Sequence, residues 1–401
     1  HHRPDLRDRR RVVDLMGLAR AACIDDLRRL AQRRIPRFAF DLVDGGAEDE
    51  SNLRRNVGAF DDIRLTPRYL VDASSIDTRV EIFGHRFDVP FGMAPIGMLN
   101  AFWPDADRTL ARLCAAKNMP YVASAAASTT LEELAEAADG NAWFQLYASS
   151  DEAVSEGLVA RAEAAGYDVM MVTADVPAAG KRDRDIRNQL SVPFKLTPEV
   201  VLQLVTHPLW SLTTLRHGKP DIANYADLLQ NATSYADVQK TLISANYTWD
   251  HLKRLRDRWP GKLLVKGLLH PGDAVRCADI GCDGVVVSNH GGRQVAFGPS
   301  TIEVLPAIAE ALAGRTKILL DSGIRRGADM IRAKALGADF VLTGRAMAFG
   351  VGAGGADGAE RAFDILELEL VRALGQLGTT RYDAVTDAVL ADRVRHPRAV
   401  A

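Results

Sequence analysis

The sequence predicts an α/β fold, a (β/α)8 TIM barrel with an N-terminal helical lead-in and a long insertion after the fourth strand. Two observations support this prediction. From Phe91 onward, short apolar runs alternate eight times with longer segments of helical periodicity, which is typical of parallel strands covered by helices. Glycines and polar side chains follow most of these runs, as expected where barrel strands end at a catalytic face.

Residues 1–90 precede the first expected strand and are predicted to form a helical lead-in packed on the barrel. Apolar side chains recur at helical spacing among the arginines of residues 12–34, which indicates amphipathic helices. A further helix over residues 38–44 runs into two glycines. The lead-in therefore has apolar faces to bury against a larger body.

The barrel is expected over residues 91–380, followed by a C-terminal tail over residues 381–401. Its strands are predicted at residues 91–94, 121–123, 142–147, 169–173, 263–266, 284–287, 317–321 and 340–343. Helices are predicted between them at residues 105–117, 131–138, 152–165, 272–279, 303–313 and 327–336. The strands are short and mostly apolar, as parallel strands buried on both faces are.

An insertion over residues 182–249 interrupts the fourth strand-helix round on the face that carries the chemistry. Insertions of this length commonly form lids or docking segments. Part of it, residues 195–220, combines Lys195, Arg216 and Lys219 with an apolar stretch that contains Val200, Val201, Leu202, Leu204, Val205, Leu209, Trp210, Leu212 and Leu215. Two interpretations stay open: the stretch docks on a membrane surface, or it packs on the barrel or on a neighbouring subunit.

Composition excludes several classes of protein. Fifty Lys and Arg residues stand against fifty-two Asp and Glu residues, a formal net charge of −2, so no overall electrostatic signature of nucleic-acid binding is present. The four cysteines form no CxxC pair, and neither disulfides nor a metal site is expected. The first apolar stretch is broken by Asp14 and Arg20, too soon for a signal peptide or a spanning helix. A cytoplasmic location is therefore expected.

A histidine and an arginine follow the predicted strand at residues 284–287. The segment there reads Ser288-Asn289-His290-Gly291-Gly292-Arg293-Gln294. Its two glycines end the strand, which puts His290 and Arg293 at the mouth of the barrel. A lone histidine is more commonly structural, but this position beside glycines and an arginine favours a functional base.

The last two predicted strands end in glycine-arginine segments. Residues 321–327 read Asp-Ser-Gly-Ile-Arg-Arg-Gly, so that Asp321, Gly323 and Arg325 follow one strand, and Gly344 and Arg345 follow the next. Glycines expose backbone N–H groups, helix starts offer a positive end, and arginine forms bidentate hydrogen bonds with a dianion. Each pair alone would be a weak signal, but at adjacent strand ends they predict a phosphate-bearing cofactor.

Other strand ends also carry polar side chains: Ser124, Gln145, Tyr147, Thr173, Asp175 and Lys266. Any one of them could be a hydrogen-bonded residue without a catalytic role, and Ser124 alone would be interpreted so. Lys266 differs, because an ammonium at the centre of the barrel mouth needs an anionic partner to offset its desolvation. Together these residues predict a polar pocket with a cationic side.

These motifs resemble the FMN-dependent α-hydroxy-acid dehydrogenase and oxidase family over residues from about 36 to about 375. The most specific match is residues 288–294, and further matches are residues 45–50, 143–147, 264–267 and 321–327. Residues 207–218 resemble an inserted loop that attaches a family member to a membrane. The resemblance implies an FMN enzyme that oxidises an (S)-2-hydroxy acid to the 2-keto acid and passes electrons to a quinone-type acceptor.

The resemblance also implies roles for single residues. His290 would accept the hydroxyl proton or the α-proton of the substrate, with Asp175 stabilising the imidazolium. Arg182 and Arg293 would hold the substrate carboxylate, and Tyr147 would hydrogen-bond the substrate oxygen. Contacts with the cofactor would come from Pro95, Ile96, Gly97, Ser124, Gln145, Thr173, Lys266, Ser288, Asp321, Gly323, Arg325, Gly344 and Arg345. The resemblance further implies that this protein is a homo-oligomer, a tetramer, and that it attaches to the inner face of the membrane.

One residue departs from the family pattern. Leu42 stands where the family usually has a tyrosine that helps bind the substrate carboxylate. A lost hydrogen bond to a charged group typically costs about 1.5–3 kcal/mol. The substrate is therefore expected to be an aryl or otherwise bulky acid, or alternatively a modified peptide or natural-product intermediate. A non-catalytic flavin-binding protein is disfavoured, since an unused site has no reason to keep five costly polar groups.

Overall fold

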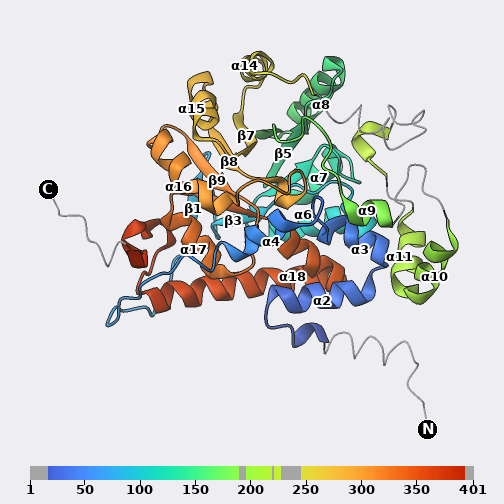
Figure 1. The fold of residues 1–401 in the computed structure, drawn as a ribbon, viewed down its shortest axis with the longest axis horizontal. Helices are drawn as coiled ribbons and strands as arrows, with labels where there is room; N and C mark the ends of the chain where they lie inside the picture. The colour runs from blue at the N-terminus through green and yellow to red at the C-terminus, as the bar shows by residue number, and fades with distance from the viewer. Residues whose placement is uncertain (1–16, 189–195, 219–220, 227–244, 393–401) are drawn as a thin grey trace, which may run out of the picture.

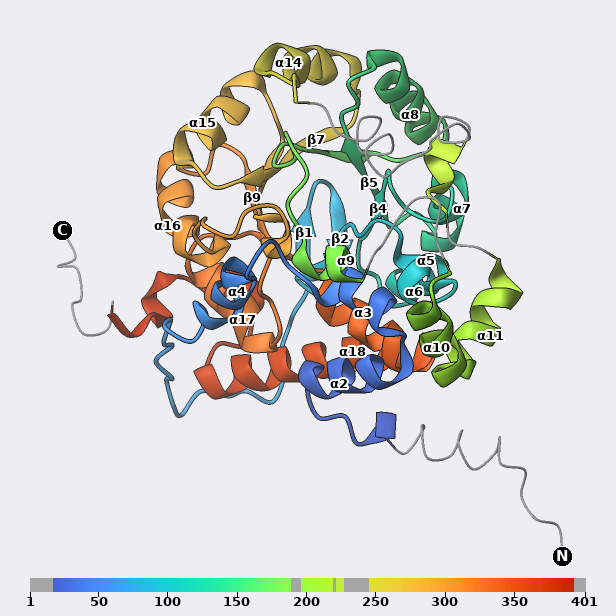
Figure 2. The same cartoon turned by 45° about the vertical axis from the view of Figure 1, so that its right-hand side comes forward.

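A computed structural model describes residues 17–188, 196–218, 221–226 and 245–392. Eight parallel strands close a barrel in the order β10-β3-β4-β5-β6-β7-β8-β9, visible as a ring of helices around strands in Figure 2. The strands are β3 (Phe91–Met93), β4 (Tyr121–Ser124), β5 (Ala142–Tyr147), β6 (Val169–Thr173), β7 (Lys262–Leu268), β8 (Gly284–Val287), β9 (Lys317–Leu320) and β10 (Phe340–Thr343). The predicted TIM barrel is confirmed.

Helices cover the outside of the barrel (Figure 1). They are α6 (Ala106–Ala116), α7 (Leu131–Ala138), α8 (Glu152–Ala164), α14 (Trp249–Arg258), α15 (Pro271–Ile280), α16 (Thr301–Leu312), α17 (Gly327–Ala335) and α18 (Arg345–Leu377). Helices α7 and α16, for example, begin with capping boxes of Thr130 with Glu133 and of Ser300 with Glu303. These pairs satisfy backbone N–H groups that the first helical turn leaves unpaired.

The barrel interior forms a separate apolar core from the layer between strands and helices. A short antiparallel hairpin, β1 (Val80–Ile82) and β2 (His85–Phe87), contributes Ile82 and Phe87 to this inner core. Phe87 packs on Trp143 and Phe340, with ring centroids 6.0 and 6.1 Å apart. The lead-in is therefore not only helical: its last part is a hairpin that packs into the end of the barrel opposite His290.

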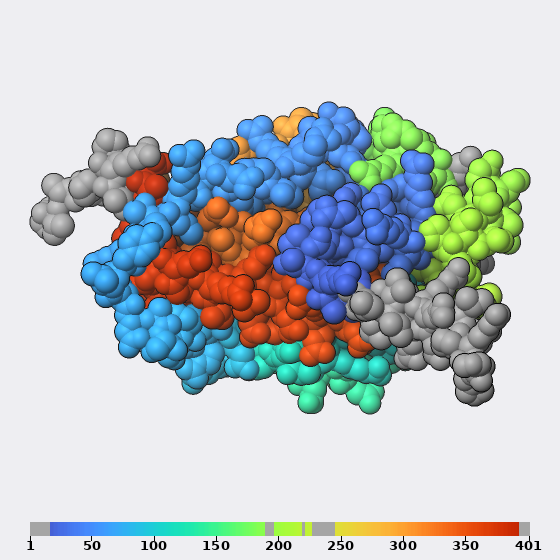
Figure 3. All heavy atoms as spheres, turned by 90° about the horizontal axis from the view of Figure 1, so that it is seen from below, coloured from blue at the N-terminus to red at the C-terminus, as the bar shows by residue number. Residues whose placement is uncertain are grey.

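The helices of the lead-in are α2 (Ile24–Arg34), α3 (Arg37–Asp44) and α4 (Ser51–Gly58). Helix α2 buries Leu27 and Ala31 and lies against α18, where the blue lead-in crosses the red helix in Figure 3. Helix α3 buries Phe40 between Phe102 and Phe349, with ring centroids 6.1 and 6.2 Å away. Packing of these apolar faces brings α3 and α4 onto the face of the barrel where the strands end.

The described part of the insertion contains α9 (Asp183–Arg187), α10 (Pro198–Thr206), α11 (Pro208–His217) and the 3-10 turn η1 (Ala223–Tyr225). Trp210 anchors it: the indole is 4% exposed, donates to the carbonyl of Phe102 at 2.9 Å and packs edge-on against Phe38. The opposite side exposes Leu196, Val201, Leu202, Val205, Leu209, Leu212 and Leu215. Lys195 and Lys219 lie outside the described residues.

Among the remaining short helical turns are α5 (Leu99–Phe102), η3 (Tyr382–Ala384) and η4 (Asp387–Val389). Tyr382 is buried and donates to the carbonyl of Met330 at 3.1 Å, so the chain after α18 packs on α17. Within the described ranges, no helix combines the length and apolarity that crossing a bilayer requires.

Candidate active site

The C-terminal ends of the barrel strands bring the predicted site residues to one face. Residues 95–97 follow β3, Ser124 ends β4, Gln145 and Tyr147 lie on β5, Thr173 and Asp175 on and after β6, and Lys266 on β7. Ser288, His290 and Arg293 follow β8, residues 321–325 follow β9, and Gly344 with Arg345 follow β10. All eight strands therefore contribute, as expected of an active site in this fold.

His290 lies between an acid and a phenol. Its Nδ1 is 3.1 Å from Asp175 Oδ1, and its Nε2 is 3.2 Å from the Tyr147 hydroxyl. The residue starts the 3-10 turn η2 (His290–Gly292) at φ +58°, and its N–H donates to Ser288 Oγ at 3.1 Å. The loop therefore fixes the backbone, and the two hydrogen bonds fix the orientation of the ring.

Asp175 is held as a carboxylate. Burial raises its pKa, but the charge of His290, the hydrogen bond to it and the charge of Lys266 outweigh burial and bring the pKa below its ordinary value. Its buried Oδ2 has no hydrogen-bond partner among the described residues. An ionised Asp175 beside Nδ1 favours the charged imidazole, which suits a histidine that accepts a proton.

Lys266 is 4% exposed and contacts two polar groups, one after β8 and one after β9. Its Nζ donates to Ser288 Oγ at 2.9 Å and lies 3.2 Å from Asp321 Oδ2. Burial lowers the pKa of Lys266, but the charges of Asp321 and Asp175 outweigh burial and raise it. The site therefore contains a permanent buried cation.

Three buried side chains form a hydrogen-bonded row across β4, β5 and β6. Ser124 Oγ donates to Gln145 Oε1 at 2.8 Å, and Gln145 Nε2 donates to Thr173 Oγ1 at 2.9 Å. Gly97 lies against Ala126, where a Cβ would be 3.0 Å from the Ala126 side chain, and the Ala126 N–H donates to Ser124 Oγ of this row at 3.2 Å. A flat polar wall with a close backbone approach can accept the edge of a planar ring.

Two arginines follow β9 and β10 without a direct carboxylate partner in the described structure. Arg325 Nη1 donates to the carbonyl of Ile324, and Arg345 donates to the carbonyls of Val43, Gly45 and Gly291. Burial lowers the pKa of Arg325 to about 10, and burial together with the charges of Arg293 and Arg325 lowers that of Arg345.

Partly buried cations of this kind carry a desolvation cost that a bound anion would offset. Gly323, at φ +110°, and Gly344 flank the arginines. A Cβ at Gly323 would collide with the backbone of Asn56, so only glycine fits there. The residues thus fit a phosphate dianion, and with it an FMN molecule whose ring would lie along the row from Ser124 to Thr173.

The two arginines predicted to bind a carboxylate both lie at the mouth but are held differently. Arg182, the N-cap of α9, has its Nε 3.1 Å from Asp185 Oδ2. Arg293 Nη1 donates to the carbonyl of Gly45 at 2.9 Å. A carboxylate and a carbonyl therefore orient the two guanidinium groups.

A cluster of asparagines that the sequence analysis missed supports the His290 loop. The Asn289 amide donates to Asn56 Oδ1 at 2.7 Å and to Asn52 Oδ1 at 3.2 Å, and it accepts from Asn56 Nδ2 at 2.8 Å. All three residues are buried. Asn52 and Asn56 lie one turn apart on α4, and this spacing of two amides was the available signal.

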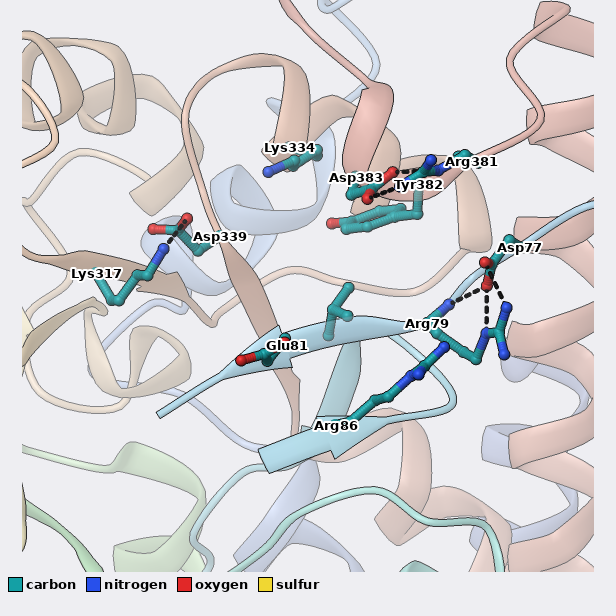
Figure 4. Close-up of a pocket in the computed structure, with 11 residues that line it drawn as sticks. Asp77, Arg79, Glu81, Arg86, Lys317, Lys334, Asp339, Arg381, Tyr382 and Asp383 are labelled. Atoms are coloured by element: carbon teal, nitrogen blue, oxygen red, sulfur yellow. Dashed lines mark hydrogen bonds and ion pairs between the residues drawn. The ribbon is translucent and has the colours of Figure 1, made fainter. Parts of the chain in front are cut away.

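A charged cavity of about 350 Å³ lies at the other end of the barrel (Figure 4). Its charges are largely paired, as in Lys317 with Asp339, Arg79 with Asp77 and Arg381 with Asp383. Lys317 begins β9, so the cavity lies at the N-terminal ends of the strands. That face of a TIM barrel serves stability rather than catalysis, and the cavity is separate from the site at His290.

Fold and site together define a flavin-type oxidoreductase: a TIM barrel with a phosphate site after its last two strands and a base at its mouth. A sequence profile described as FMN-dependent dehydrogenase matches residues 31–392, and the chain belongs to this family. FMN is accordingly its cofactor, as the strand ends predicted.

Relatives with known names are similar over most of their length. The chain is 41% identical over 360 residues to "(S)-mandelate dehydrogenase" of Pseudomonas putida, covering 88% of this chain and 90% of the relative. It is 38% identical over 370 residues to "L-lactate dehydrogenase" of Ectopseudomonas mendocina, covering 91% and 97%. Within the family, the chain is thus similar to (S)-mandelate dehydrogenase over most of its length.

Solved structures agree with this assignment. A crystal structure titled "monotopic membrane protein (S)-mandelate dehydrogenase" superposes with a TM-score of 0.88 at 38% identity, covering 92% of this chain and 99% of that one. A mandelate oxidase with (S)-4-hydroxymandelic acid superposes with a TM-score of 0.80 at 32% identity, covering 91% and 97%. The chain is therefore an FMN-dependent dehydrogenase in fold and family.

Proposed function

We propose that this enzyme oxidises an (S)-2-hydroxy acid to the 2-keto acid, with His290 as the base. The observation that carries the proposal is the contact of His290 with Asp175 on one side and Tyr147 on the other, at 3.1 and 3.2 Å. Arg182 and Arg293, at the same mouth, supply cationic forks suited to a carboxylate. Bound FMN would supply the two-electron acceptor.

Each of the active-site side chains has one role in this proposal. His290 Nε2 accepts a proton from the substrate, either from the hydroxyl or from the α-carbon, and Asp175 stabilises the resulting imidazolium. Tyr147 donates a hydrogen bond to the substrate oxygen. Burial raises the pKa of Tyr147 to about 12, so the phenol stays protonated and can donate throughout the neutral range. Lys266 stabilises negative charge at the cofactor edge.

We further propose an aryl or otherwise bulky side chain for the substrate. Leu42, partly buried on α3, offers apolar contact where the family has a phenol. A large side chain can recover the lost hydrogen bond by burying apolar area at roughly 25 cal/mol per Å². A modified peptide or natural-product intermediate is the second candidate, because Leu42 also fits a substrate without a carboxylate at that position.

Two other features support a proposal for the electron acceptor and for the location of the enzyme. A Cβ at Gly97 would lie only 3.0 Å from the Ala126 side chain. By family resemblance, glycine at this position is typical of dehydrogenases rather than oxidases, which supports a quinone-type acceptor and slow reaction with oxygen. The exposed apolar side chains of α10 and α11 support peripheral attachment to a membrane. A homo-oligomer, by family resemblance a tetramer, completes the proposal.

A panel of substrates tests this function. The purified holoenzyme is mixed anaerobically with (S)-mandelate, (S)-lactate, glycolate and a long-chain 2-hydroxy acid, and loss of the flavin absorbance is followed in time. Fast loss with mandelate and slow loss with lactate and glycolate is the expected order. No loss with any 2-hydroxy acid would overturn the proposal in favour of the second candidate.

A further inference from the structure

Helix α9 is tied to the lead-in by one guanidinium. Arg184 Nη1 lies 3.1 Å from Asp41 Oδ1 and 2.8 Å from Asp44 Oδ2, and its Nη2 lies 2.6 Å from Glu50 Oε2. One side chain of the insertion therefore contacts three carboxylates of residues 41–50, a segment that begins on α3 and ends at the start of α4.

The carboxylates around Arg184 are largely shielded from water. Side-chain exposure is 6% for Asp41, 5% for Asp44 and 14% for Glu50. Burial raises the pKa of Asp44, but hydrogen bonds from Arg28 and Arg184 outweigh burial and bring it below its ordinary value. Removing the guanidinium would leave buried carboxylates facing one another with fewer cations, a strongly unfavourable arrangement.

The same segment also contacts the loop that carries Arg293. The carbonyl of Gly45 accepts from Arg293 Nη1 at 2.9 Å. The next amides bridge two loops: Ala47 N–H donates to the carbonyl of Gly292 at 2.8 Å, and Glu48 N–H donates to that of Lys181 at 2.7 Å. Residues 41–50 thus contact both loops on which Arg182 and Arg293 are placed, and these loops also meet directly where the Gly180 N–H donates to Gln294 Oε1 at 2.8 Å.

Arg182 is consequently held from both sides along the chain. On one side, the carbonyl of Lys181 accepts a hydrogen bond from the amide of Glu48. On the other side, Arg184 ties α9 to Glu50. Within the helix, Asp185 Oδ2 contacts Arg182 Nε at 3.1 Å, which sets the direction of the guanidinium. Two contacts therefore set the separation of Arg182 from Arg293: the direct one between Gly180 and Gln294, and the seating of α9 on residues 41–50.

We propose that Arg184 is a positioning residue for this reaction. By seating α9 on residues 41–50, it sets the separation of Arg182 from Arg293 and with it the fit of the substrate carboxylate. This inference rests on the proposed function, in which those two arginines bind that carboxylate.

The test compares Arg184→Met with a matched control, Arg187→Met. Arg187 lies on the same helix, is 66% exposed and contacts Asp183 at 3.3 Å. The readouts are KM and kcat for the best 2-hydroxy acid of the panel, the Kd of benzoylformate from the perturbed flavin spectrum, FMN content and Tm. We expect Arg184→Met to raise KM and Kd by about tenfold with FMN retained, and Arg187→Met to leave all five readouts unchanged.

A conservative variant covers the case in which Arg184→Met folds poorly. Arg184→Lys keeps the positive charge but loses the fork that spans Asp44 and Glu50, so we expect correct folding with an intermediate rise in KM. If Arg184→Lys lowers the FMN content or the Tm but leaves KM and Kd unchanged, Arg184 has a merely structural role, and the inference is overturned.

A double-mutant cycle separates this inference from the proposed function. If Arg184 acts through Arg182, the variant Arg182→Met/Arg184→Met should be no worse than Arg182→Met alone. Additive losses would overturn the inference while leaving the proposed function intact. If Arg182→Met itself leaves KM and Kd unchanged, the assignment of Arg182 to the carboxylate fails instead.

Discussion

His290 and Asp175 make contact across a strand that separates them. His290 follows β8 and Asp175 follows β6, with β7 between, yet Nδ1 and Oδ1 are 3.1 Å apart. Gly267 of β7 permits this, because a Cβ there would lie 2.5 Å from the Asp175 Cβ, and its φ of +105° suits glycine alone. A glycine in the intervening strand thus lets the carboxylate reach the imidazole.

The contact predicts the effect of neutralising Asp175. Asp175→Asn keeps the shape but removes the charge that stabilises the imidazolium, so flavin reduction should slow by roughly 10- to 100-fold, the equivalent of about 1.5–3 kcal/mol for a charge-assisted hydrogen bond. Anaerobic stopped-flow absorbance measures the rate, and FMN content serves as the control. A rate within twofold of wild type would exclude a supporting role for this carboxylate.

Arg325 should act on the cofactor phosphate. Arg325→Met removes a partly buried cation that lies over the Phe349 ring, so the Kd for FMN should rise by about tenfold or more. The apoprotein should melt no lower than wild type, because the cation lacks a carboxylate partner in the described structure. Isothermal titration calorimetry of the apoprotein with FMN measures the change. The control is Arg326→Met, because the Arg326 side chain is 62% exposed. Equal FMN affinity in both variants would contradict the phosphate assignment.

Leu42 should determine which acids are accepted. Leu42→Tyr restores a donor near the carboxylate site and should raise kcat/KM for lactate or glycolate by about tenfold or more, given a hydrogen bond of ~1.5 kcal/mol. Steady-state kinetics with a dye acceptor measures it, and Leu42→Phe, which lacks the hydroxyl, is the matched control. If Tyr and Phe behave alike with every simple acid, the natural-product candidate gains support.

The exposed face of α10 and α11 should bind membranes. The double variant Val205→Ser/Leu212→Ser removes two apolar side chains that are each more than half exposed. It should weaken binding to anionic vesicles by about tenfold or more without changing turnover. Vesicle co-sedimentation measures the effect, with Leu368→Ser on α18 as a control at another exposed site. Wild-type protein that stays in the supernatant would mean that this face has another role.

The barrel was predictable because its signals are local and repeated. Strand limits over residues 142–147, 169–173, 284–287 and 340–343 agree with the structure residue for residue, since each strand is an apolar run that ends at a glycine or polar residue. The placement of polar groups at the strand ends was predictable for the same reason: Ser288, Asn289 and His290 come directly after such a run.

Contacts between distant segments were not predictable from the sequence. Arg184 is one of many arginines, and nothing near it indicates that three carboxylates some 140 residues earlier converge on it. The β1–β2 hairpin was missed as well, because its strands are only three residues long and their burial depends on the barrel around them. Tertiary packing, rather than local pattern, determines both features.

Single-turnover reduction in a His290→Ala protein tests the central claim most directly. The variant is loaded with FMN, its cofactor content is confirmed by absorbance, and it is mixed anaerobically with the best 2-hydroxy acid of the panel. If His290 is the base, the cofactor stays bound and its reduction slows by roughly 100- to 10,000-fold. Reduction at the wild-type rate with the same substrate would contradict the account.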